Sequence, residues 1–135
     1  MSTKSIVSSS KAPAAIGPYS QAIVANGLVY TAGVIPLDPQ TNAIAGDDIQ
    51  SQAERVLKNL SGLLQDAGSS LDNVIKTTCF LQDLDDFPVF NEVYASFFNG
   101  DATPARSTVE VAGLPMGVLV EIECVALLNE HGQEG

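Results

Sequence analysis

Arg106 is the most distinctive candidate for chemistry in this chain of 135 residues. It is the only lysine or arginine after Lys76, in a stretch that carries many carboxylates. A guanidinium can hold a carboxylate through two parallel hydrogen bonds, so Arg106 could bind a carboxylate-bearing ligand. The alternative is a structural ion pair with Glu110, Glu121 or Glu123, and spacing alone leaves both interpretations open.

Four further polar side chains could act beside such a cation. Glu121 and Glu123 lie two residues apart, on one face of a predicted strand, where a carboxylate could orient or deprotonate a water molecule or simply be solvated. Tyr19 could donate a hydrogen bond to a ligand or only pack in a loop, and Asn91 could be an ordinary amide on a helix surface. His131, the single histidine, lies in the polar tail, so catalysis by histidine is not expected.

The composition argues against several other classes of protein. Sixteen acidic and six basic residues give a net charge of -10, and the cations are spread along the sequence, so we expect no binding to nucleic acid or to an anionic membrane. The sequence has no membrane-spanning apolar run and no secretory signal, which predicts a cytoplasmic protein. Cys79 and Cys124 lie in apolar runs without metal-ligand spacing, so we expect buried thiols and no metal site.

Hydrophobic patterning predicts one α+β domain over residues 1–135. Asn26-Gly27 between two apolar runs indicates a hairpin, and the prolines of 11–19 indicate an ordered loop. Asp47 or Asp48 is expected to begin one helix, and Asp85 or Asp86 another that ends at Gly100. The predicted strands are 5–7, 21–24, 28–31, 74–81, 106–111 and 118–128, and the predicted helices run from 47 or 48 to about 67 and from 85 or 86 to 100.

This order of elements predicts two layers, with a mixed sheet of about six strands and both helices on one of its faces. The strand 74–81 is β-branched and apolar, and we expect it to be buried on both faces. The last strand also carries apolar residues on both faces. We therefore expect an oligomer that covers the free face of the sheet.

Several of these residues occur within recognisable sequence motifs. Six stretches follow one another in order: APAAIGPYSQA at 12–22, YTAGVIPLDPQT at 30–41, VIKTTCFLQDLDDF at 74–87, FNEVYASFF at 90–98, PARSTVEVAGLP at 104–115 and VLVEIECVAL at 118–127. Together they closely resemble the RidA/YjgF family of reactive-intermediate (enamine/imine) deaminases, over nearly the whole chain.

The resemblance implies a chorismate-mutase-like fold and a homotrimer with active-site clefts between subunits. It implies the activity of a 2-iminobutanoate/2-iminopropanoate deaminase, which hydrolyses enamines and imines such as 2-aminoacrylate to 2-oxo acids and ammonia. It also implies that neither a metal nor an organic cofactor is used.

The resemblance assigns roles by matching position. Arg106 would clamp the substrate carboxylate, and Glu121 would hold or activate the attacking water. The cleft would also be lined by Tyr19, Gly33 and Asn91. Thr108 would contribute its backbone amide. Many relatives have cysteine in place of Thr108 and serine in place of Ala32, so we expect an altered substrate preference.

The sequence leaves two other functions open. One is an endoribonuclease or translation inhibitor, a role attached to some relatives, although the net charge of -10 counts against it. The other is a non-catalytic module that binds small carboxylates such as 2-oxo acids. Turnover of an imine separates the deaminase from both.

Overall fold

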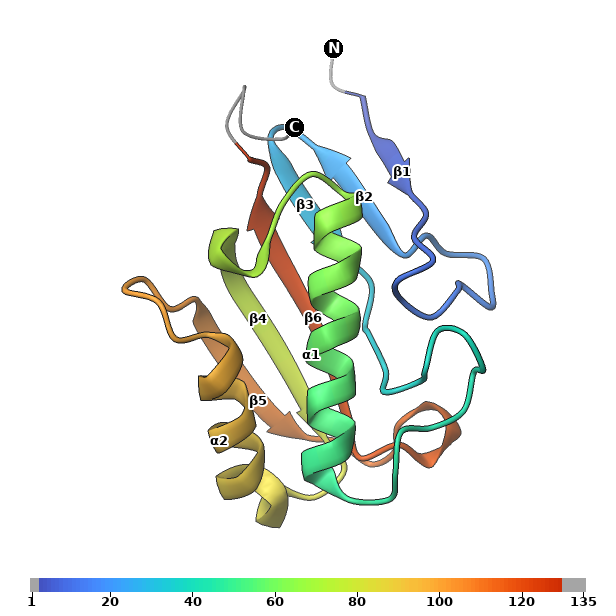
Figure 1. Cartoon of the computed structure of the whole chain (residues 1–135), viewed down its shortest axis with the longest axis vertical. Helices are drawn as coiled ribbons and strands as arrows, with labels where there is room; N and C mark the ends of the chain where they lie inside the picture. Colours follow the sequence, from blue (N-terminus) through green and yellow to red (C-terminus); the bar gives the residue numbers. More distant parts are fainter. Residues whose placement is uncertain (1–2, 130–135) are drawn as a thin grey trace.

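The fold is a six-stranded sheet with two helices on one face (Figure 1), described for residues 3–129 of a computed structural model. His131 lies outside the described residues. The predicted two-layer α+β arrangement is confirmed. In chain order the elements are β1 (Ser5–Val7), β2 (Ala22–Ala25), β3 (Leu28–Thr31), α1 (Ile49–Asp66), β4 (Val74–Leu81), α2 (Phe87–Phe97), β5 (Ala105–Glu110) and β6 (Val120–Leu127), with short 3₁₀ turns at Leu71–Asn73, Leu84–Asp86 and Pro115–Gly117.

The strand order is β1-β2-β3-β6-β4-β5. All neighbouring strands are antiparallel except β4 and β5, which run parallel and are connected through α2. The β2–β3 hairpin turns at Asn26 and Gly27, which have φ of 53° and 79°, as the sequence predicts. The last strand therefore lies inside the sheet, between β3 and β4.

Helix α1 begins and ends at the residues that its sequence favours. The Asp48 side chain accepts a hydrogen bond from the Ser51 amide at 2.7 Å and caps the first turn. The chain leaves the helix at Ala67, and Gly68 takes a φ of 86°, a conformation that glycine adopts without strain. The apolar stripe of α1 is buried against the sheet.

Helix α2 ends earlier than the sequence predicts. Pro88 lies in its first turn as expected, but the helix stops at Phe97 instead of continuing to Gly100. Phe98 leaves the helical conformation, with φ of -110° and ψ of 73°, and its ring packs in the core 4.6 Å from the ring centre of Tyr94. Burial of this large ring ends the helix before the glycine does.

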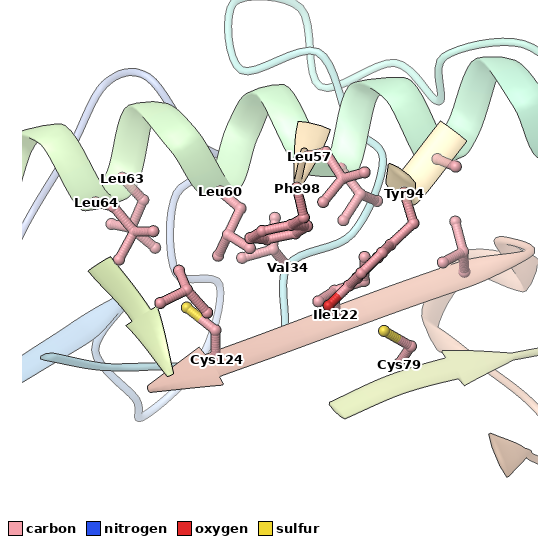
Figure 2. Close-up of a cluster of buried hydrophobic side chains, with 14 of the residues drawn as sticks. Val34, Leu57, Leu60, Leu63, Leu64, Cys79, Tyr94, Phe98, Ile122 and Cys124 are labelled. Carbon is pink, nitrogen blue, oxygen red and sulfur yellow. The ribbon is translucent and has the colours of Figure 1, made fainter. Parts of the chain in front are cut away.

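The core lies between the helices and one face of the sheet (Figure 2). Leucines of α1 pack over Ile122 and Cys124 of β6, and Tyr94 of α2 and Phe98, the residue that follows α2, close the same layer. Cys79 and Cys124 are buried free thiols, as predicted. Burial raises the pKa of Cys79 to about 11 and that of Cys124 to about 12, so both stay protonated and unreactive at neutral pH.

The other face of the sheet is open in the single subunit. The prediction that β4 is buried on both faces is wrong here: Thr77 and Cys79 are buried under the helices, while Ile75 is 43% exposed. The strand register places exposed apolar side chains from several strands on this open face, namely Ile6, Tyr30, Val109 and Leu127. Within residues 3–129, neither helix has the length and apolar character that crossing a membrane requires.

Candidate active site

The Arg106 side chain is held under α2 by aromatic rings and one amide. Its Nη1 donates a hydrogen bond to Asn91 Oδ1 at 2.8 Å. Its Cζ lies 4.6 Å from the ring centre of Tyr94 and 5.3 Å from that of Phe87. Rings of this kind attract a guanidinium and fix its plane without neutralising its charge.

No carboxylate in residues 3–129 pairs with Arg106, so the structural ion pair is excluded there. The single ion pair in this part of the chain joins Lys11 and Asp66 at 3.3 Å. Glu110, which shares a face of β5 with Arg106, instead accepts a hydrogen bond from the Leu84 amide at 2.8 Å. The arginine thus keeps hydrogen-bonding capacity for a carboxylate from outside the subunit.

Thr108 lies two residues along β5 and on the same face as Arg106. The Val111 amide donates to the Leu81 carbonyl of β4 at 2.9 Å. Because alternate residues of a strand direct their backbone groups to opposite sides, the Thr108 amide is directed to the free edge of β5. This orientation supports the predicted use of that amide by a ligand.

A second group of predicted residues meets at a pocket of about 410 Å³. Tyr19, Gly33 and Glu121 all line it. Its remaining lining residues are mostly apolar: Ile16, Ala32, Ile35 and Pro115. The pocket therefore brings together three segments that are distant in the sequence: the loop with Tyr19, the segment after β3 with Gly33, and the strand β6 with Glu121.

Glu121 packs directly on Gly33 within this pocket. A Cβ added to Gly33 would lie 2.7 Å from Glu121 Cδ and would overlap Oε2. No larger residue at this position leaves the carboxylate where it is. Burial raises the pKa of Glu121, and the charge of Glu123 raises it further. A carboxylate with a raised pKa is a better proton acceptor near neutral pH.

Tyr19 is 51% exposed, so close packing does not explain its position. Its hydroxyl oxygen accepts a hydrogen bond from the Ile16 amide at 3.4 Å. This contact uses the oxygen as acceptor and leaves the phenolic proton for a ligand. Tyr19 is placed to donate to a molecule in the Glu121 pocket.

The two groups lie on opposite faces of the sheet. Arg106 and Thr108 face the helices together with Thr77 and Cys79, their partners in β4. Glu121 pairs with Phe80, and both belong to the open face. The chain therefore carries two separate candidate half-sites: the Arg106 half-site, with Asn91 and Thr108, and the Glu121 half-site, with Tyr19 and Gly33.

The sequence interpretation missed the two rings that hold Arg106. Phe87 and Tyr94 lie seven residues apart on α2, which is the spacing of two helical turns. Aromatic residues at helical spacing ahead of a lone arginine are the signal that was available. No group of three or more His, Cys, Asp or Glu in residues 3–129 is arranged to hold a metal ion.

The cations are less dispersed in space than in sequence. Lys11, Arg55 and Lys58 line one depression of about 430 Å³ beside α1, and none of the predicted site residues lines it. Asp38 lines the same depression, and Lys11 is already paired with Asp66. The local charge is thus partly compensated by carboxylates.

Comparison with known proteins identifies the family. The model described as Endoribonuclease L-PSP matches residues 9–128. The chain therefore belongs to the RidA/YjgF family, as its motifs predict.

Individual relatives are similar to this chain in sequence over most of its length. The chain is 53% identical to the RutC family protein slr0709 of Synechocystis, over 93% of this chain and 98% of that protein. It is 49% identical to the chloroplastic Reactive Intermediate Deaminase A of Arabidopsis thaliana, over 93% of this chain and 66% of that one.

Solved structures confirm the fold. A putative endoribonuclease L-PSP from Entamoeba histolytica superimposes with a TM-score of 0.90 at 50% identity, covering 93% of this chain and all of that one. Escherichia coli TdcF with bound serine superimposes with a TM-score of 0.87 at 44% identity, covering 93% of this chain and 99% of that one.

Proposed function

We propose that this protein hydrolyses small 2-imino and 2-enamino carboxylates to 2-oxo acids and ammonia. The observation that carries the proposal is Arg106, a guanidinium stacked on Tyr94 and Phe87 with no carboxylate partner in residues 3–129. Such a cation suits a small carboxylate. A relative named as a reactive intermediate deaminase and a related structure that binds serine, a small carboxylate, support this choice.

The half-site of Glu121 supplies the chemistry. A protonated imine is electrophilic, so water adds to its carbon once a base accepts a proton from that water. Glu121 takes this proton and returns one to the amino nitrogen of the tetrahedral adduct. The C–N bond then breaks as the carbonyl forms, Glu121 accepts the hydroxyl proton of the adduct, and the released ammonia takes up that proton and leaves as ammonium. Orientation and one base suffice because the substrate is already activated.

We further propose that each cleft forms between subunits of a homotrimer. The sheet separates Arg106 from Glu121 in one subunit, so a common substrate needs the Arg106 half-site of one copy and the Glu121 half-site of another. The open sheet face supports this assembly, because Tyr30, Val109 and Leu127 are exposed apolar residues that a second copy would cover.

The endoribonuclease is the second candidate, because the matching family model carries that description. The depression with Lys11, Arg55 and Lys58 is the place where a phosphate backbone would bind. The net charge of -10 opposes such binding over longer distances. A non-catalytic carboxylate-binding module would need Arg106 but not Glu121.

The deciding experiment uses two single variants. Imines are generated from amino acids by an amino-acid oxidase, and Arg106→Ala and Glu121→Gln are each expected to abolish their hydrolysis. Lys58→Ala removes an exposed cation elsewhere and should keep full activity. Imine turnover that survives Arg106→Ala, or RNA cleavage without imine turnover by the unmodified protein, would contradict the proposal.

Mixing the two variants tests the cleft between subunits. In trimers formed by co-expression in equal amounts, about a quarter of the clefts receive an intact Arg106 from one copy and an intact Glu121 from another. About a quarter of the activity should return. If the mixed trimers are as inactive as each variant alone, both residues act in clefts within single subunits. Light scattering that shows a monomer would exclude the homotrimer.

A further inference from the structure

A second cavity opens beside the Glu121 pocket. It has a volume of about 240 Å³ and shares Ile16, Tyr19, Gly33 and Ile35 with that pocket. Residues common to both linings make the two spaces neighbours along the segment that follows β3. A molecule whose reacting carbon lies beside Glu121 could therefore extend into this cavity.

The inner wall of the cavity belongs to the hydrophobic core. Val34, Leu37 and Leu63 are 6%, 5% and 1% exposed, and all three line it. Ala14 and Met116, both exposed, line it as well and place its entrance at the surface. The cavity thus leads from the solvent side of the 12–19 loop toward α1.

Three polar side chains line the cavity; Tyr19 is shared with the Glu121 pocket, and the other two offer little to a ligand. Gln21 uses its amide to hold the loop: Oε1 accepts from the Ser9 amide at 2.7 Å, and Nε2 donates to the Pro13 carbonyl at 2.7 Å and to the Ser9 carbonyl at 3.1 Å. Asn42 lies in an exposed turn. An apolar group would meet mainly hydrocarbon, whereas a charged one would lose its hydration without compensation.

We infer that this cavity receives the side chain of the substrate, and that the preferred substrates are 2-imino acids with branched aliphatic or aromatic side chains. The inference rests on the proposed deaminase function and specifies its substrate class. With the carboxylate on Arg106 of another subunit and the imine carbon beside Glu121, the side chain leaves the reacting carbon toward the space that shares Gly33 and Tyr19. A methyl group would leave this space largely unfilled.

The expected preference follows from burial of methylene groups. Each buried methylene improves binding about fourfold. The imine of leucine carries three more carbons than that of alanine, so complete burial would favour it roughly 60-fold. Partial burial still predicts an advantage of about tenfold or more in kcat/KM.

The test compares two adjacent alanines in one loop. Ala14 lines the cavity, whereas Ala15 is exposed and lines neither cavity. Ala14→Leu should reduce kcat/KM for the leucine imine at least about tenfold while changing that for the alanine imine less than threefold. Ala15→Leu should leave both unchanged. A loss equal for both imines in Ala14→Leu, or no preference for the leucine imine in the unmodified protein, would overturn the inference.

A binding measurement keeps this test separate from the deaminase proposal. Pyruvate and 4-methyl-2-oxopentanoate carry the same side chains as the two imines and need no turnover. If the unmodified protein hydrolyses no imine, the deaminase proposal fails, and calorimetry with these two acids still decides the role of the cavity. Tighter binding of the longer acid that is lost in Ala14→Leu supports the inference, and equal affinities refute it.

Discussion

Replacement of Gly33 by alanine should disable the site without unfolding the protein. The new Cβ would lie 2.7 Å from Glu121 Cδ, and ordinary contact begins at 3.4 Å. The carboxylate must therefore retreat by on the order of 1 Å, since Oε2 lies closer still. A displacement of about 1 Å in a catalytic group can cost about 100-fold in rate, which corresponds to about 2.7 kcal/mol in the activation barrier.

The backbone of Gly33 favours the fold of this variant. Its φ lies outside the left-handed region, so alanine is tolerated there and even lowers the entropy of the unfolded chain. The assay pairs kcat/KM for imine hydrolysis with a melting temperature. Gly100→Ala is the control, because a Cβ on Gly100 meets no atom within 4 Å. Unchanged kcat/KM in Gly33→Ala would refute the assignment of Glu121 as the base.

Three further predictions concern single side chains. Because the pKa of Glu121 is raised, the rate of hydrolysis should begin to fall at a pH above 4.5, the ordinary pKa of glutamate, when the solution is acidified; a rate that falls only below pH 4.5 would contradict this. Glu121→Gln should be no less stable than the unmodified protein at neutral pH, because the ionised carboxylate costs free energy there. Asn59→Ala should lower the free energy of unfolding by about 2–3 kcal/mol in denaturant titrations, because buried Asn59 donates to the Leu37 carbonyl at 2.8 Å. Tyr94→Phe should cost about 1–2 kcal/mol, because buried Thr77 Oγ1 loses its partner at 2.8 Å and keeps only the weak contact with Cys79 Sγ at 4.0 Å. Imine turnover should stay near normal because the ring remains over Arg106, and turnover lost together with stability would show that the hydroxyl has another role.

Local patterns in the sequence predict most elements of this fold. Asn26-Gly27 specifies the hairpin, and Asp48 with Gly68 bounds α1, because each acts through neighbours in the chain. The end of α2 is missed because it depends on the burial of Phe98, a contact with distant residues. The burial of β4 is overestimated because an apolar composition does not reveal whether the cover comes from the same subunit.

The site residues are recoverable by motif, but their arrangement is not. Alternation along β5 puts Arg106 and Thr108 on one face, and alternation along β6 puts Glu121 and Ile122 on different faces of the sheet. Neither pattern states that β6 pairs with β4 or that β4 and β5 are parallel. The separation of Arg106 from Glu121 follows only from that register.

The central place of β6 has a consequence for folding during synthesis. β6 is the last of the six strands to leave the ribosome, yet it pairs with both β3 and β4. Until it emerges, those two strands have exposed edges, and the leucines of α1 lack their partners Ile122 and Cys124. The sheet must therefore close late, through contacts between distant parts of the chain, and such closure is slow. Nascent chains stalled before Val120 should need protection from aggregation.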